Sequence, residues 1–226
     1  MNRVDISQLV ELDAAFGTLG AKVGPRVGPN KRSQDSKEWF ILRRFIAHAL
    51  RERMFGLPIS IEKAKPPKPD FVVKYGETNR VAFIEITEAT NPADQREMTE
   101  FEKSNERIML LGDFGGRFSG GASQPKIAWT SDILDAVIRK QGKSIYSSLM
   151  GGRHLIIYPN SNASALVSDQ EDEREAFEFL ELVIAERRKK YTEAVNGCMV
   201  HILGKVYVCF DLFGTRQLIT RTGNRP

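Results

Sequence analysis

Residues 69–87 read PDFVVKYGETNRVAFIEIT, two short runs of β-branched and aromatic residues around the polar turn Gly76–Asn79. Such runs on either side of a four-residue loop with Gly and Asn are typical of a β-hairpin. Asp70 stands at the start of the first run, and Glu85 lies near the end of the second, with fourteen residues between them. An antiparallel pairing through this turn therefore brings the two carboxylates close together.

Glu85 lies inside an apolar run, where a carboxylate is costly to bury unless something pairs with it. Because side chains alternate along a strand, Glu85 and Thr87 share one face, while Ile86 and Glu88 point to the other. Two converging carboxylates repel each other unless a cation lies between them. Hard oxygen ligands of this kind suit Mg²⁺ or Mn²⁺. The pattern therefore predicts a divalent cation at this end of the hairpin.

Pro-Asp, a hairpin and then Glu-x-Lys form the signature of the PD-(D/E)XK nuclease superfamily. Pro69, Asp70 and Glu85 resemble this signature, with Thr87 in place of its lysine. The resemblance covers roughly residues 35–158 and implies an α/β fold with a restriction-endonuclease-like core. Such a core has a mixed central sheet flanked by helices, to which this chain adds a C-terminal helix and β-hairpin. The alternative is a surface hairpin with an incidental Asp after a proline turn.

The resemblance also implies a set of metal ligands. Asp70, Glu85 and the carbonyl group of Ile86 would bind Mg²⁺ (or Mn²⁺), and Glu38 would reach the same site from the first core helix. Helical spacing places Glu38 on the core-facing side of that helix. Glu38 also fits a capping pattern in which its side chain bonds back to the amide of Asp35. Both interpretations of Glu38 stay open.

Thr87 can make a hydrogen bond but carries no charge, so the role of the missing lysine has to be filled from elsewhere. Some diverged members of the superfamily supply it from a neighbouring helix. Here a helix is expected from Ser131 to about Leu149, and Lys140 follows Val137 by three residues on its inward stripe. Lys140 and Gln141 are the preferred replacements. The alternative is a solvated basic helix face.

The rest of the pattern predicts one domain over residues 33–215, with an N-terminal short helix and a Gly/Pro-rich basic arm in 1–32 and a basic tail in 216–226. Helices are expected over residues 5–16, 35–55, 94–111, 131–149 and 171–191, strands over 59–61, 154–158, 199–203 and 205–210, and a mobile glycine-rich loop over 112–121.

The 226 residues carry a net charge of +4, which is compatible with a nucleic-acid partner. Basic residues gather near the two ends of the chain, at Lys22, Arg26, Lys31, Arg32, Arg216, Arg221 and Arg225. These residues either contact phosphate or belong to solvated ends. The three histidines, His48, His154 and His201, are scattered and are expected to be satisfied or exposed rather than ligands.

Cys198 and Cys209 have no metal-ligand spacing and are expected to be reduced core residues of a cytoplasmic protein. No apolar stretch approaches the roughly 18 residues that span a bilayer, and the N-terminus has no signal-peptide pattern. A membrane partner is therefore not expected.

The leading expectation is a metal-dependent nuclease that hydrolyses phosphodiester bonds in DNA, with Asp70, Glu85, Thr87, Lys140 and Glu38 as its catalytic residues. RNA as substrate and a homodimeric state are left open. One alternative is a catalytically inactive nuclease-fold protein that binds nucleic acid or a protein partner. Another is an α/β protein of unrelated function with a coincidental motif.

Overall fold

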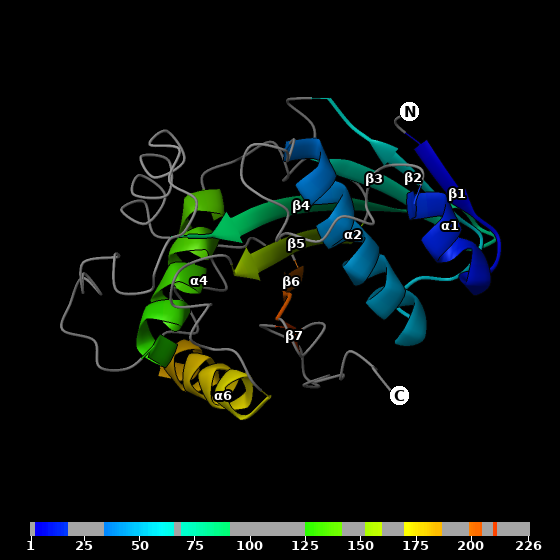
Figure 1. Ribbon diagram of the computed structural model, residues 1–226. Helices are drawn as coiled ribbons and strands as arrows, with labels where there is room; N and C mark the ends of the chain where they lie inside the picture. The colour runs from blue at the N-terminus through cyan, green and yellow to red at the C-terminus, as the bar shows by residue number, and fades with distance from the viewer. Residues whose placement is uncertain are drawn as a thin grey trace, which may run out of the picture.

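The computed structural model describes residues 3–17, 34–65, 69–90, 125–141, 152–159, 170–186, 199–204 and 210–211. Its strands are β1 (Arg3–Ile6), β2 (Ile59–Lys63), β3 (Phe71–Tyr75), β4 (Arg80–Ala89), β5 (Gly152–Pro159), β6 (Met199–Ile202) and β7 (Phe210–Asp211). Its helices are α1 (Leu12–Gly17), α2 (Gln34–Arg51), α4 (Pro125–Gln141) and α6 (Gln170–Glu186), with a 3₁₀ turn η1 (Leu9–Glu11) before α1. Figure 1 shows their arrangement.

The strands described form one mixed sheet in the order β1-β2-β3-β4-β5-β6-β7. Strands β1 to β4 are an antiparallel meander, β5 and β6 run parallel to β4, and β7 returns antiparallel to β6. Parallel neighbours need a crossover, and α4 and α6 lie in the two crossover connections. The protein is therefore an α/β protein with a mixed open sheet, as the sequence predicted.

Helices cover both faces of the sheet (Figure 1). The first apolar cluster joins α1 and α2 to one face and includes Ile84, Ile86 and Ile156. The second joins α4 and α6 to the other face and includes Leu155 and Ile157. Consecutive residues of β5 thus belong to different clusters, as alternation along a strand requires. This confirms that β5 is buried on both faces.

The hairpin of β3 and β4 forms as predicted. Its pairs run from Phe71 opposite Ile84 to Tyr75 opposite Arg80. Gly76 and Asn79, at the two ends of the turn, have φ of 69° and 50°. Gly takes this left-handed conformation without strain, and Asn takes it more readily than most residues.

Two helices have boundaries that differ from the prediction. The helix expected over residues 35–55 ends at Arg51, and Arg53 follows with φ of 57°. A left-handed residue after the last turn ends a helix. Ser131, the expected start of the next helix, lies inside α4, which begins six residues earlier at Pro125. Proline is favoured at the first position of a helix because its missing N–H would have no helical partner there.

The N-terminal segment also differs from the prediction. Residues 5–16, expected as one helix, contain the end of β1, the turn η1 and most of α1. Strand β1 pairs with β2 and buries Val4 and Ile6. Several expected features lie outside the described residues: segments 94–111 and 112–121, both cysteines and the basic residues near the chain ends. Where the structure describes a helix, that helix is too short or too polar to cross a membrane.

Candidate active site

Asp70 directly precedes β3, at the open end of the hairpin. If the β3–β4 register is continued by one pair, Asp70 stands opposite Glu85. The side chain of Asp70 bends back onto the partner strand, where its Oδ2 atom accepts a hydrogen bond of 2.8 Å from the Ile86 N–H. This bond fixes the carboxylate at the edge of the ladder, next to the strand that carries Glu85.

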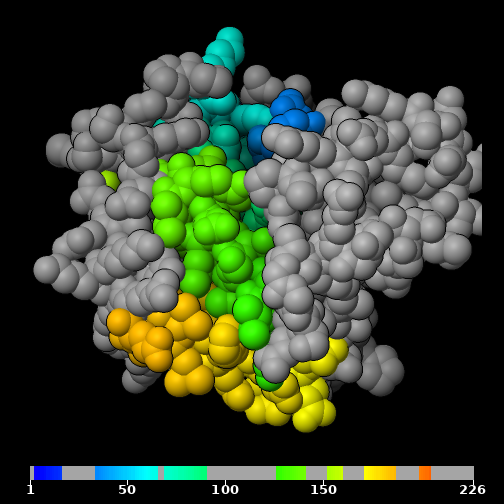
Figure 2. All heavy atoms as spheres, turned by 90° about the vertical axis from the view of Figure 1, so that its left-hand side faces the viewer, coloured from blue at the N-terminus to red at the C-terminus, as the bar shows by residue number. Residues whose placement is uncertain are grey.

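Glu85 points to the α4 side of the sheet and meets Lys140 there. The Nζ atom of Lys140 lies 2.6 Å from Oε1 of Glu85, and the two side chains are only 21% and 10% exposed. Lys140 lies in the last turn of α4, where a cation also complements the helix dipole. Figure 2 shows α4 in green along this face of the molecule, with one end beside the strands and α2. The lysine expected from the crossover helix is therefore in contact with the motif glutamate.

Glu38 reaches the same region from the first turns of α2, on the other face of the sheet. It is buried, and its two oxygens accept hydrogen bonds from Gln34 (2.9 Å) and Lys63 (2.8 Å). Lys63 also binds Asp35. Burial opposes the charge on Lys63, but the hydrogen bonds to Asp35 and Glu38 outweigh it and raise the pKa of Lys63. Glu38 thus has a cation of its own.

The environment of Asp70 raises its pKa to about 6. Burial contributes most, because it disfavours the charged form, and the negative charge of Glu85 adds to it. The Ile86 N–H and Lys140 act in the other direction, and Glu38 raises the pKa further. These effects place Asp70, Glu85, Glu38 and Lys140 in one electrostatic neighbourhood, although they come from separate elements.

Three other residues of the motif region have definite positions. Thr87 is half-buried on the strand face that it shares with Glu85. Glu88 points to the α2 side, as predicted, where it pairs with Lys37 at 3.2 Å. The Arg139 guanidinium lies 3.5 Å from the carbonyl oxygen of Glu88. For Gln141 the described structure gives the backbone position alone, at the end of α4.

Asp70 and Glu85 fit a hard divalent cation by the chemistry of their donor atoms. Magnesium is commonly held by one or two carboxylates, with the remaining positions taken by water and phosphate oxygens. Within the part of the chain that the structure describes, no three His, Cys, Asp or Glu side chains are arranged to hold a metal ion. Glu38 is bound by Lys63 and Gln34. Its position therefore suits a negative charge close to the site better than the role of a third metal ligand.

Two features of this region were missed by the sequence analysis. Lys63 follows Ile59 and Ile61 at spacing two, so strand alternation alone could have placed it on the inward face of β2. The three histidines, expected to be satisfied or exposed, are all buried in the core. The Nδ1 atom of His154 lies 2.9 Å from Nε2 of His201. Burial lowers the pKa of His201 most, and the nearby His154 and His48 lower it further.

Comparison of the chain with models of known protein families, with curated proteins and with solved structures gives no match.

Proposed function

We propose that this protein is a metal-dependent nuclease that hydrolyses phosphodiester bonds in DNA, built on a restriction-endonuclease-like core. The observation that carries the proposal is the meeting of Asp70 and Glu85 at one end of the hairpin with Lys140 on the crossover helix. The element order α2-β2-β3-β4-α4-β5 supports it, because a helix, a three-strand meander, a helix and a fourth strand make up that core.

In this proposal Asp70, Glu85 and the carbonyl group of Ile86 hold Mg²⁺ or Mn²⁺. The bound cation supplies positive charge at the scissile phosphate and favours ionisation of the attacking water. Asp70 is positioned for this role by the Ile86 N–H, which leaves its second oxygen available within the described structure. The raised pKa of Asp70 indicates that the site favours a positive charge beside the two carboxylates.

Lys140 takes the role of the missing motif lysine. In this proposal its ammonium group, 2.6 Å from Glu85, stabilises the negative charge that develops on the phosphate during hydrolysis. The last turn of α4 and the ion pair with Glu85 hold this ammonium group in position. Thr87, on the same face of β4, is a neutral hydrogen-bonding group for the water or the phosphate.

Glu38 and Lys63 form the wall of the site on the α2 side. The ion pair of 2.8 Å with Lys63 holds the Glu38 carboxylate in place, where its negative charge adds to burial and Glu85 in raising the pKa of Asp70. In this proposal Glu38 acts on Asp70 through its charge and does not contact the cation.

One observation favours a second function. Glu85 and Glu38 are each already paired with a lysine, which would satisfy them in a protein that never binds metal. A nuclease-fold protein that binds nucleic acid or a protein partner without cleavage is therefore the alternative.

Cleavage of plasmid DNA in Mg²⁺ and in Mn²⁺ separates the two functions. The parent is expected to cut, and Asp70→Asn and Glu85→Gln are expected to lose activity by at least two orders of magnitude. Glu77→Gln is the matched control, because Glu77 is an exposed carboxylate in the turn, at the opposite end of the hairpin from Asp70 and Glu85. Equal cleavage by the parent and both site variants would sink the nuclease proposal. A parent that binds DNA but never cuts it would favour the alternative.

A further inference from the structure

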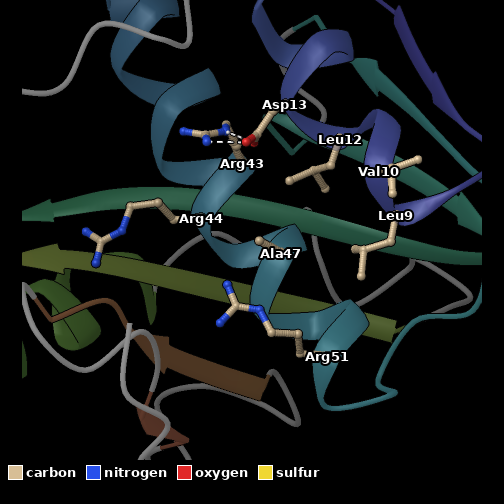
Figure 3. Close-up of a pocket in the computed structure, with 8 residues that line it drawn as sticks. All are labelled: Leu9, Val10, Leu12, Asp13, Arg43, Arg44, Ala47 and Arg51. Atoms are coloured by element: carbon tan, nitrogen blue, oxygen red, sulfur yellow. Dashed lines mark hydrogen bonds and ion pairs between the residues drawn. The ribbon is translucent and has the colours of Figure 1, made fainter. Parts of the chain in front are cut away.

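A basic pocket lies between the N-terminal elements and α2, away from the candidate active site. Its volume is about 390 Å³, and the residues that matter here are Leu9, Val10, Asp13, Arg43, Arg44 and Arg51. Figure 3 shows Leu9 and Val10 on the η1 side of the pocket and the three arginines on α2. The pocket therefore presents apolar side chains on one side and guanidinium groups on the other.

The three arginines differ in what holds them. Arg43 binds Asp13 at 2.6 and 3.0 Å, and the Asp13 side chain is 71% exposed, so solvent weakens this pair. Arg44 donates a hydrogen bond of 2.6 Å to the Gly204 carbonyl, which fixes its position. Arg51 is exposed, and the described residues offer it no ion pair. The pocket lining thus contains three arginines and one acid, Asp13. This excess of positive charge favours an anionic ligand.

Basic residues on α2 lead from the pocket towards the candidate active site, where the first of them, Lys37, pairs with Glu88. Lys37, Arg44 and Arg51 are seven residues apart, which is close to two helical turns, so they follow one line along the helix. Lys37 adjoins Glu38 at the candidate site, and Arg51 lies at the pocket. A rise of 1.5 Å per residue separates the ends of this line by about 21 Å. This length corresponds to about six phosphates along one strand of B-DNA.

The exposure of the residues at the rim of the pocket indicates what size of ligand the pocket suits. Small-molecule sites bury most of the ligand between apolar walls. Here Val10 is 84% exposed and Leu9 is 49% exposed, so the apolar wall is open to solvent. Such a wall suits contact with the sugars of a ligand that continues beyond the pocket.

We propose that this pocket, with the line of cations on α2, binds the phosphate backbone of the nucleic acid whose scissile bond lies at Asp70 and Glu85. The inference rests on the proposed function, and it adds a second contact region about 21 Å along α2 from Lys37, the neighbour of Glu38. In this arrangement Arg51 and Arg43 bind phosphates, while Val10 and Leu9 contact sugar. The contact is independent of base sequence, because phosphate carries no sequence information.

Fluorescence anisotropy of a labelled DNA duplex, measured over a range of salt concentrations without divalent metal, tests this contact apart from cleavage. Arg51→Ala is expected to weaken binding about three- to tenfold and to lower the salt slope by about one. Arg51→Glu is expected to weaken it more. Arg174→Ala is the matched control, because it removes the same charge from α6 and is expected to bind as the parent does. Circular dichroism checks that each variant is folded.

Parental affinity and salt slope in both Arg51 variants would overturn the inference. If inorganic phosphate binds the pocket while DNA affinity stays unchanged in the variants, a small anion is the ligand and the inference also fails. Loss of cleavage in Asp70→Asn together with parental DNA binding in the Arg51 variants would leave the nuclease proposal standing alone. Weaker DNA binding in the Arg51 variants, in a parent that never cuts, would support the pocket and overturn the nuclease proposal.

Discussion

Asp70 is held where its charge is unfavourable to the folded protein. Burial and the charge of Glu85 raise its pKa to about 6, and the Ile86 N–H compensates only in part. At neutral pH the ionised carboxylate therefore destabilises the metal-free protein. Residues kept at such a cost are concentrated at functional sites, where activity and stability conflict.

Asp70→Asn is accordingly expected to stabilise the metal-free protein by about 1–3 kcal/mol at pH 7.5, since the raised pKa converts to roughly that range. The asparagine oxygen can still accept the Ile86 N–H, while the repulsion with Glu85 is removed. Thermal unfolding in EDTA measures this as a rise of several degrees in Tm. Asp13→Asn, on an exposed carboxylate, is the control with little expected change. A Tm several degrees below that of the parent would instead identify Asp70 as a structural residue.

Lys140 has two separable effects, one on stability and one on catalysis. Lys140→Ala leaves Glu85 buried without its cation and is expected to destabilise the protein by about 1–3 kcal/mol. Addition of Glu85→Gln should recover most of this loss, because it removes the negative charge that Lys140 balances in the parent. In the cleavage assay, Lys140→Ala should lower kcat by orders of magnitude with little effect on DNA affinity.

Lys126→Ala is the matched control for Lys140→Ala, because Lys126 lies on the same helix but pairs with Glu175 of α6. It is expected to leave kcat unchanged. Parental kcat in Lys140→Ala at saturating DNA would rule out the assignment of Lys140 as the replacement lysine.

At the scale of elements, the sequence was sufficient to predict those features that depend on residues close together in the chain. The hairpin was predictable because its turn residues and alternating strands lie within nineteen residues. The inward position of Lys140 was predictable from its spacing to Val137, which is buried in α4. Strand β1 was not predictable from its own four residues. These residues form a strand because they pair with β2, which lies more than fifty residues later in the chain. The ion pair of Lys63 with Glu38 likewise depends on how β2 meets α2.

The contact between α6 and the end of β6 is a tertiary feature that can be tested. Glu173 of α6 is buried, and a Cβ atom on Gly204 would lie 2.5 Å from its Oε1 atom. Gly204→Ala should therefore displace the carboxylate of Glu173, which is buried and has an interaction partner in the parent. A loss of about 1–3 kcal/mol in urea unfolding is expected, in the range found for overpacked cores. Gly56→Ala is the control, because an added Cβ there meets ordinary contact at 3.7 Å. Equal losses in the two variants would contradict this account.

At the scale of the whole molecule, the buried histidines make stability depend on pH. Burial lowers the pKa of His154 to about 4, and burial together with His154 and His48 lowers the pKa of His201 well below its ordinary value of 6.5. The unfolded chain therefore binds protons below pH 6.5 that the folded core excludes. Asp70 acts in the opposite direction between about pH 6 and pH 4, because its folded-state pKa is raised.

Stability is thus expected to fall as the pH drops from 6.5 towards 4, by up to about 1.4 kcal/mol per pH unit for each histidine. Asp70 offsets part of this loss in the parent. Urea unfolding across this range should show a steeper loss in Asp70→Asn, where the offset is absent. A flat profile in both proteins would show that the histidines already bind protons in the folded state.

The central claim is that Asp70 and Glu85 hold a divalent cation together. Anomalous X-ray diffraction from crystals soaked in Mn²⁺ tests it most directly, because manganese scatters anomalously while water and Mg²⁺ do so very weakly. The account predicts a peak about 2.0–2.3 Å from a carboxylate oxygen of both residues, a distance typical of small hard cations. The claim would be contradicted if crystals at saturating Mn²⁺ showed no peak at this position and Lys140 kept its ion pair with Glu85.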